Sequence, residues 1–113
     1  MTRAAPARKI AQQAAHLYRD MHSSTALLQR WRPYICPFEL ILNSIRDGAN
    51  VLDIGCGGGL LLGLLADAGR LGQGIGVDTS ETGIALARQM QAQNGFRANL
   101  EFNQIEAGEA LPE

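Results

Sequence analysis

The sequence predicts an α/β fold in which three parallel strands alternate with helices and follow a set of N-terminal helices. Short apolar runs with an acid at or beside their ends, at 50–54 and 72–77, flank an apolar helical stretch over 59–68. Residues 1–48 instead carry apolar side chains at helical spacing. Helices between strands require crossover connections, so we expect a parallel sheet with right-handed crossovers.

Three helices are predicted before the first strand. The first covers residues 9–22, where apolar side chains recur at helical spacing. These side chains are Ile10, Ala14, Leu17 and Met21. The second runs from the capping side chains at 23–25 to Trp31, because Pro33 lacks a backbone donor and breaks the helix. The third begins at Pro37, a residue that fits the first turn of a helix.

The elements after the first strand follow the same reasoning. Ser80 caps a helix that has Glu81 in its first turn and that stops at the Asn94-Gly95 pair. Residues 100–102 form a third strand, and the sequence stops soon afterwards at Glu113. We therefore expect a sheet truncated after its third strand, with an open edge and exposed apolar surface.

Composition and charge limit the classes of partner and the location that the sequence supports. The 113-residue chain is 46% hydrophobic and 19% charged with net charge −1, as in ordinary globular domains, so charge gives no argument for nucleic acid or membrane as a partner. Up to Arg46, seven basic side chains oppose two acids, whereas three oppose nine afterwards. The basic segment is either a solvated helix face or a cap that attracts an anionic substrate. Two cysteines, Cys36 and Cys56, form no disulfide framework and favour a reducing cytoplasm.

Residues 51–59 carry the strongest functional signal. The first strand reaches Asp53 and opens into a turn with glycines at 55, 57 and 59, while the second strand ends in Asp78. Glycines let a ligand approach the backbone, and the N–H groups at the following helix start favour negative charge. A carboxylate at the end of the second strand can accept hydrogen bonds from both ribose hydroxyls. This is the layout of a nucleoside-binding βαβ unit, although Asp78 could instead cap the next helix.

The pattern D-x-G-x-G-x-G from Asp53 to Gly59 resembles motif I of the class I S-adenosylmethionine-dependent methyltransferases. The resemblance covers residues 50–112 and implies a Rossmann-like sheet, S-adenosylmethionine as cofactor and S-adenosylhomocysteine as product. Because the family's sheet has seven strands, this chain would supply the cofactor-binding half of an enzyme that methylates a small molecule. The implied organisation is a helical cap or lid over 1–48 and a partial Rossmann-like domain over 49–113.

The resemblance also implies a set of cofactor-binding residues. The methionine end of the cofactor would lie on the glycine loop with Asp53 near its amino group, and Asp78 would bind the ribose. Thr79 would flank the adenine, and Glu106 would contact its amino group, with Glu109 as the adjacent alternative. The full set is Asp53, Gly55, Cys56, Gly57, Gly59, Asp78, Thr79, Glu106 and Ala107. No catalytic residue and no metal site is assigned.

Three alternatives remain open at this stage. A nicotinamide-binding module would need a third glycine at position 60, which is Leu60, and would place Asp53 against pyrophosphate charge. A non-catalytic remnant, or a subunit completed by a second chain or by self-association, would also explain the short sheet. Residues 30–38 concentrate aromatic and arginine side chains, which either pack on the sheet or face the substrate. No basic face or appendage indicates a nucleic acid substrate.

Overall fold

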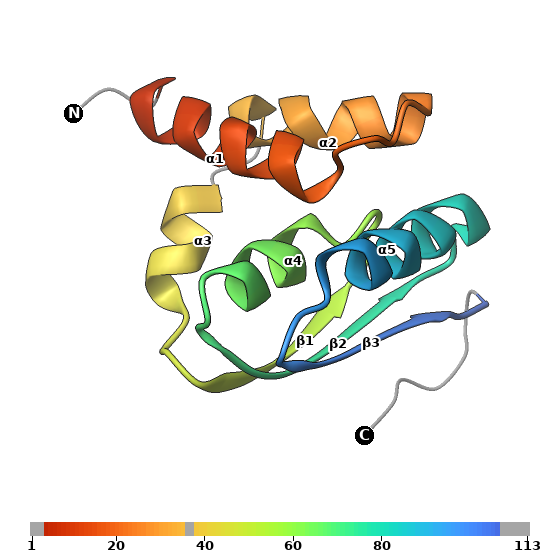
Figure 1. The fold of residues 1–113 in the computed structure, drawn as a ribbon. Helices are drawn as coiled ribbons and strands as arrows, with labels where there is room; N and C mark the ends of the chain where they lie inside the picture. Colours follow the sequence, from red (N-terminus) through yellow and green to blue (C-terminus); the bar gives the residue numbers. More distant parts are fainter. Residues whose placement is uncertain (1–3, 36–37, 107–113) are drawn as a thin grey trace.

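A computed structural model of the chain describes residues 4–35 and 38–106. Three helices come first: α1 (Ala4–Leu17), α2 (Ser24–Ile35) and α3 (Phe38–Ser44). Strands and helices then alternate as β1 (Ala49–Ile54), α4 (Leu60–Asp67), β2 (Leu71–Asp78), α5 (Glu81–Asn94) and β3 (Asn99–Gln104) (Figure 1). The predicted α/β order is confirmed, and the elements from β1 onward lie within two residues of their predicted bounds.

Two predictions about the N-terminal helices are wrong. Pro33 does not end the second helix, which continues through it to Ile35. A proline near a helix end removes one backbone bond and leaves the last turn otherwise intact. The first helix covers Ala4–Leu17 instead of residues 9–22, and Asp20 beyond it adopts a left-handed φ of 65° that no continuing helix has. The predicted start of the third helix, Pro37, lies outside the described residues.

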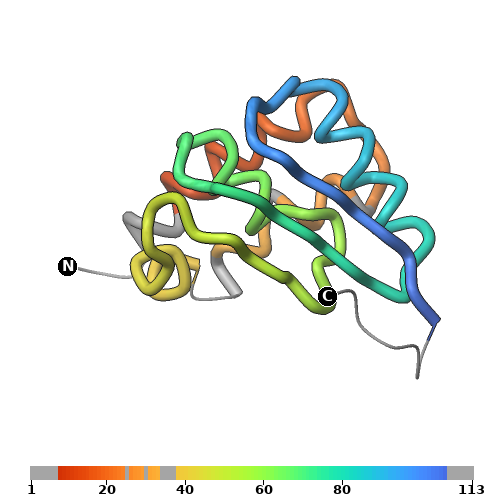
Figure 2. The backbone as a smooth tube through the Cα atoms, turned by 90° about the horizontal axis from the view of Figure 1, so that it is seen from below, coloured from red at the N-terminus to blue at the C-terminus, as the bar shows by residue number. Residues whose placement is uncertain are grey.

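The sheet has the order β1-β2-β3, and both pairings are parallel (Figure 2). The carboxyl ends of the strands therefore meet at one edge, and their amino ends at the other. Helices α4 and α5 cover one face of the sheet, and α1 and α2 lie over these two helices (Figure 1). The structure therefore has three layers: the sheet, helices α4 and α5, and the N-terminal helices α1 and α2.

The core lies between the sheet and its helices. Fully buried side chains come from α1, α4 and α5, including Leu17, Leu65 and Met90. The opposite face of the sheet carries no helix of the described residues, as the view from below shows (Figure 2). Leu52 and Ile54 on β1 remain 43% and 60% exposed there. The predicted exposed apolar surface is confirmed.

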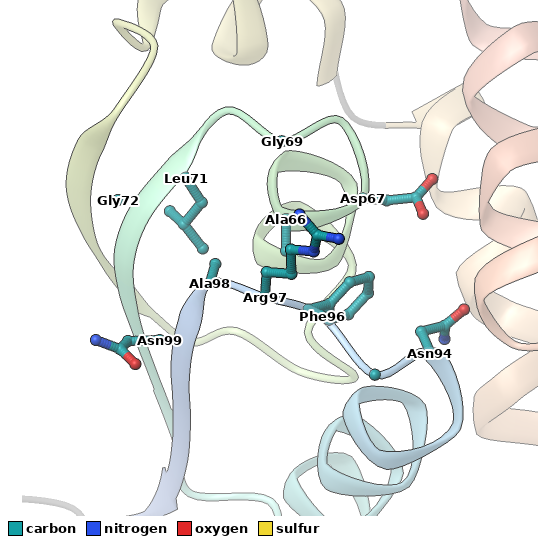
Figure 3. Close-up of a pocket in the computed structure, with 11 residues that line it drawn as sticks. Ala66, Asp67, Gly69, Leu71, Gly72, Asn94, Phe96, Arg97, Ala98 and Asn99 are labelled. Carbon is teal, nitrogen blue, oxygen red and sulfur yellow. The ribbon is translucent and has the colours of Figure 1, made fainter.

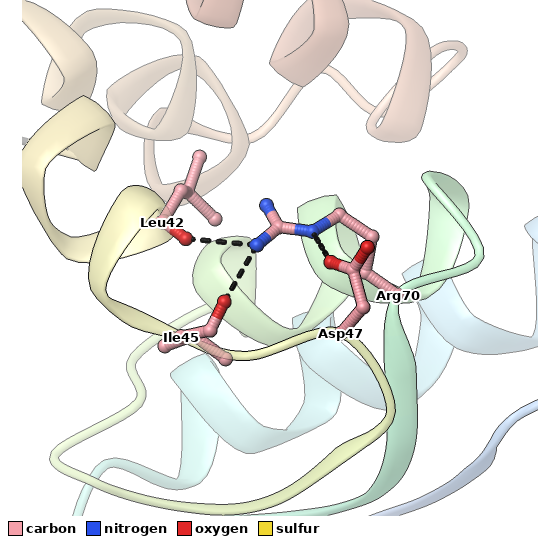
Figure 4. A network of polar contacts seen from close by, with 4 residues as sticks. All are labelled: Leu42, Ile45, Asp47 and Arg70. Atoms are coloured by element: carbon pink, nitrogen blue, oxygen red, sulfur yellow. Dashed lines mark hydrogen bonds and ion pairs between the residues drawn. The ribbon is translucent and has the colours of Figure 1, made fainter.

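A polar contact fastens α3 to the sheet layer (Figure 4). The Nη2 atom of Arg70 donates to the carbonyl oxygens of Leu42 at 3.0 Å and Ile45 at 2.7 Å, and Nε pairs with Asp47. A cation on the last carbonyls of a helix satisfies acceptors that the helix itself leaves unpaired. Arg70 lies in the turn before β2, so it fixes the end of the helical cap against the βαβ unit.

No helix within the described ranges combines the length and the apolarity that a membrane crossing needs.

Candidate functional site at the carboxyl end of the sheet

The glycine loop joins β1 to α4 and has a conformation that demands glycine. Gly55, Gly57 and Gly59 have φ values of 76°, 55° and 81°, in the left-handed region that L side chains avoid. The N–H groups of Gly55 and Cys56 donate to the Val77 carbonyl at 2.8 and 3.0 Å, which closes the loop against β2. Helix α4 starts after Gly59 with no side-chain cap, so its first N–H groups have no side-chain acceptor among the described residues.

Asp78 is bonded to this loop across the sheet edge. Its Oδ2 accepts the Gly57 N–H and its Oδ1 accepts the Ser80 N–H, both at 2.8 Å. The alternative that Asp78 caps α5 is wrong, because Ser80 is the N-cap and its Oγ accepts the Gly83 N–H at 3.0 Å. A carboxylate offers about four lone-pair positions, so two bonds leave capacity for further donors.

Asp53 lies beside the loop in a small hollow. The hollow has a volume of about 110 Å³ and is lined by side chains and backbone of α2, α3, β1, the loop and α4. The lining residues are Arg32, Phe38, Ile41, Asp53, Gly55, Cys56 and Leu61. Burial raises the pKa of the Asp53 carboxyl, Arg32 opposes this shift and the negative charge of Asp78 adds to it. A cationic ligand in the hollow would therefore stabilise the ionised form of Asp53, which burial disfavours.

Arg32 is a residue of this hollow that the predicted cofactor-binding set did not include. Its guanidinium lies 5.6 Å from the centre of the Phe38 ring, and Nη1 is 3.5 Å from the Gln29 Oε1. A Cβ added to Gly57 would stand 3.3 Å from Nη1, so the guanidinium lies directly over the loop. Within the described ranges it forms no ion pair. Two sequence signals pointed toward it: the basic charge of the N-terminal segment, and the arginine and aromatic side chains of residues 30–38, for which a substrate-facing position was one of two interpretations.

The hollow presents opposite charges to a ligand. Arg32 reaches it from the helical cap and Asp53 from the end of β1. A guanidinium binds carboxylates and an acid binds amines, so the pair fits the amino acid end of S-adenosylmethionine. The left-handed glycines leave the room that this end needs above the backbone. The described residues therefore fit the cofactor that the sequence implied.

Cys56 has no nucleophilic character in this setting. Its side chain is buried, and burial, with Asp53 and Asp78 nearby, raises the pKa of the thiol to about 12. The thiol therefore stays protonated at neutral pH, and only the thiolate is a good nucleophile. Sγ contacts the Gly57 carbonyl at 3.6 Å, which makes Cys56 a packing residue of the loop.

The remaining predicted residues lie at the same edge of the sheet. Thr79 is exposed directly after Asp78, and its carbonyl accepts Gln104 Nε2 at 3.3 Å. The Ile105 N–H donates to the Asp78 carbonyl at 3.0 Å, which draws the segment with the exposed Glu106 toward the end of β2. Ala107 and Glu109 lie outside the described residues. The structure thus gathers every described residue of the predicted set at one edge.

A second hollow, of about 600 Å³, lies at the amino end of the sheet (Figure 3). The ends of α4 and α5 and the starts of β2 and β3 line it, with Asp67, Asn94 and Arg97 among its polar residues. None of the predicted site residues reaches it, and Asp67 and Arg97 are exposed. It is the roomier of the two hollows, but its charged side chains are exposed and its Asn94 is already hydrogen-bonded to Arg19 and to the Leu17 and Met90 carbonyls.

Comparisons with known proteins show the family and the fold. A family model described as "Methyltransferase domain" matches residues 45–113. The chain is 33% identical over 94 residues to a ubiquinone biosynthesis O-methyltransferase of Leptothrix cholodnii, covering 83% of this chain and 35% of that protein. The chain therefore spans about a third of the length of this curated relative.

Solved structures show the same fold. The YcgJ protein of Bacillus subtilis matches with a TM-score of 0.56 at 28% identity, over 67% of this chain and 32% of that one. A SAM-dependent methyltransferase of Aquifex aeolicus matches with a TM-score of 0.57 over 88% of this chain and 49% of its own, and at 19% identity it supports the fold alone.

Proposed function

The chain belongs to the methyltransferase-domain family, and on this premise we propose that it binds S-adenosylmethionine and supplies the cofactor-binding half of a methyltransferase. The observation that carries the proposal is the bond from Gly57 N–H to Asp78 Oδ2, which joins the glycine loop to the acid that we propose binds the ribose. When bound, the cofactor supplies a methyl group already activated on a sulfonium. The protein's part is then to hold it and to place an acceptor in line.

Arg32 and the predicted residues outside the glycine loop have separate roles in this proposal. Asp53 receives the amino group of the methionine end, and Arg32 receives its carboxylate. Asp78 accepts hydrogen bonds from the ribose hydroxyls while it keeps its bond to the loop. Thr79 and Glu106 flank the adenine, together with Ala107. No residue is proposed as a catalytic base, since positioning an acceptor needs none in principle.

The acceptor is proposed to be a hydroxyl group of a small molecule. Support comes from the curated relative, which is named an O-methyltransferase of ubiquinone biosynthesis. Phe38 and Ile41 of α3 add an apolar wall beside the hollow, which suits an acceptor with an apolar body. We place the protein in the reducing cytoplasm, and the free thiol of Cys56 supports this location.

The bare face of the sheet supports a further part of the proposal: that this half-domain associates with a completing chain or with itself. Leu52 and Ile54 present apolar surface beside an edge strand that has no partner on its outer side in the described sheet. Ile54→Lys should reduce association measured by sedimentation velocity, with Asn43→Lys, an exposed position on α3, as a matched added charge. A wild-type chain that sediments as a monomer up to high concentration would exclude self-association.

Isothermal titration of the 113-residue chain with S-adenosylhomocysteine tests the cofactor site, with NADH as the control ligand. We expect saturable binding of S-adenosylhomocysteine alone, and weaker binding after Arg32→Gln, which removes the charge but retains hydrogen-bonding capacity. Binding of NADH in its place would favour the nicotinamide module. A chain that circular dichroism shows to be folded and that binds neither ligand would contradict the proposal.

A further inference from the structure

One side chain of the helical cap is hydrogen-bonded to the backbone of the glycine loop. Tyr18 follows α1, and its hydroxyl donates to the carbonyl oxygen of Gly58 at 2.5 Å. The Tyr18 side chain is fully buried and comes from 40 positions earlier in the chain. A buried contact over this separation ties two parts of the fold that the sequence does not bring together.

The Gly58 carbonyl needs such a partner. The ladder of α4 begins one residue later, where the Gly59 carbonyl accepts the Gly63 N–H at 2.9 Å. Gly58 is buried, so solvent does not replace the missing donor. Burial also raises the pKa of Tyr18, which keeps its hydroxyl protonated and able to donate. Without Tyr18 this carbonyl would therefore lose a hydrogen bond that the helix does not supply.

The bond fixes one peptide plane of the loop from both sides. The plane between Gly58 and Gly59 carries the carbonyl bonded to Tyr18, and its N–H donates to the Cys56 carbonyl at 2.9 Å. Its rotation would turn the N–H groups that open α4, where the methionine end of the cofactor is proposed to lie. The orientation of this plane is thus set jointly by the cap and by the loop.

Neighbouring side chains pack closely around Gly58 of the loop. A Cβ added to Gly58 would stand 2.9 Å from Gln29 Cδ of α2 and 3.0 Å from Leu86 Cδ2 of α5. Real Cβ atoms essentially never lie as close as 2.9 Å to another heavy atom, and 3.0 Å is already a tight contact, so Gln29 and Leu86 fill the space around Gly58 on two sides. Helix α2 covers the loop through Gln29, and the end of α1 holds it through Tyr18.

We infer that Tyr18 is a positioning residue of the cofactor site, so that the end of α1 is a fixed wall of this site and not part of an opening lid. The inference rests on the proposed function. Tyr18 would affect binding of the amino acid end of the cofactor, because its hydrogen bond to Gly58 orients the glycine loop. It would not affect binding of the ribose, because the bond does not orient Asp78. A ligand that lacks this end should be insensitive to the hydroxyl.

Tyr18→Phe tests the inference because it removes the hydroxyl and keeps the ring. Titrations at a temperature where each variant is folded should show about tenfold weaker binding of S-adenosylhomocysteine, as expected for one lost buried hydrogen bond. Binding of 5′-methylthioadenosine, which lacks the amino acid end, should stay within about twofold of wild type. Leu71→Val, a buried change at the amino end of the sheet, is the matched control for lost stability and should alter neither ligand.

Hydrogen exchange separates this inference from the proposed function. In the ligand-free chain, the amides of 57–63 should exchange faster in Tyr18→Phe than in Leu71→Val, relative to the global stability of each. Equal exchange, or equal S-adenosylhomocysteine affinity in wild type and Tyr18→Phe, would overturn the role of Tyr18. A folded wild-type chain that does not bind S-adenosylhomocysteine would overturn the cofactor site, and exchange would then decide whether Tyr18 still orients the loop.

A second probe applies if Tyr18→Phe fails to fold. Uniform 3-fluorotyrosine labelling retains the hydroxyl, and Tyr34→Phe assigns the two fluorine resonances. The Tyr18 resonance should shift on addition of S-adenosylhomocysteine and shift less with 5′-methylthioadenosine. Identical spectra with and without a saturating amount of the former would overturn the inference.

Discussion

The two ends of the sheet differ in what they offer a ligand. At the carboxyl end, a hollow of about 110 Å³ brings together Asp53, Arg32 and the glycine loop under the helical cap. At the amino end, a hollow of about 600 Å³ is lined by solvated turns and by the last residues of α4 and α5 (Figure 3). In the smaller hollow, burial shifts the pKa of Asp53, which lies with Arg32 in the same lining. In the larger hollow the charged side chains, Asp67 and Arg97, are exposed.

The topology of the sheet explains why the candidate site residues lie at its carboxyl edge. In a parallel sheet with helical crossovers, every strand delivers its carboxyl end, and the start of the next helix, to the same edge. Asp53 with the glycines of the loop, and Asp78, come to this edge from two separate stretches of the chain. The amino edge receives the ends of helices, whose exposed carbonyls and turn residues are already solvated. Volume is therefore a poor guide to function in this fold.

Asp78→Ala should have the largest effect on binding. It removes a charged acceptor of the ribose and the partner of the Gly57 N–H, so we expect a loss of roughly 2–4 kcal/mol in binding of S-adenosylhomocysteine. Asp67→Ala removes an exposed acid from the amino-end hollow and should leave the affinity unchanged. Isothermal titration of both variants measures the contrast. Equal affinities would remove the distinction between the two ends.

Gly57→Ala and Gly69→Ala separate loop function from backbone strain. Their φ values of 55° and 70° are both left-handed, so each variant should lose about 1–2 kcal/mol of unfolding free energy in urea. A Cβ at Gly57 would also press on Arg32, whereas a Cβ at Gly69 meets open space. Only Gly57→Ala should therefore weaken cofactor binding. A matching loss in Gly69→Ala would mean that stability, and not the loop, controls affinity.

The raised pKa of Asp53 predicts that affinity depends on pH. Its ordinary pKa is 3.8, and burial raises the value in the ligand-free chain. A bound amino group would favour the ionised carboxylate, so binding should weaken as pH falls through the raised pKa toward 3.8, by up to about tenfold per pH unit. The stability of the ligand-free chain depends on pH in the opposite direction. Because the folded state binds the Asp53 proton more tightly than the unfolded state, the contribution of Asp53 to the free energy of unfolding grows as pH falls.

Asp53→Asn supplies the control for this titration. The variant should bind more weakly at neutral pH and show a flatter affinity across the same window, since residue 53 no longer titrates. Titration calorimetry in buffers of different ionisation enthalpy would detect proton release on binding to wild type only. A pH dependence that survives in Asp53→Asn would assign the titration to another group.

Arg70 and Asp47 give the smallest expected effects and concern stability alone. Arg70→Ala removes donors to two carbonyls at the end of α3 and should cost about 1–2 kcal/mol of unfolding free energy (Figure 4). Asp47, with a side chain 77% exposed, contributes only a screened ion pair, so Asp47→Ala should stay within about 0.5 kcal/mol of wild type. Urea unfolding measures both, and cofactor affinity should not change in either variant.

Local signals predicted the βαβ unit better than the helical cap. The glycines at 55, 57 and 59 require their turn wherever the chain places it, and Ser80 caps α5 as its type favours. Pro33 and the end of α1 were misjudged, because helices that pack on one another tolerate a proline and stop where tertiary contacts require. The site followed the same rule: motif residues were identified, but Arg32 and Tyr18 were not.

The sequence by itself determined the order of elements, the glycine loop and the two acids at the ends of β1 and β2, because these features depend on residue type and on spacing along a few neighbouring positions. Only the tertiary structure decided that Arg32 covers Gly57 and that Tyr18 bonds Gly58. Those contacts join residues 25 to 40 positions apart, and no local propensity encodes where two packed helices meet. Packing of the cap on the βαβ unit therefore completes the candidate site.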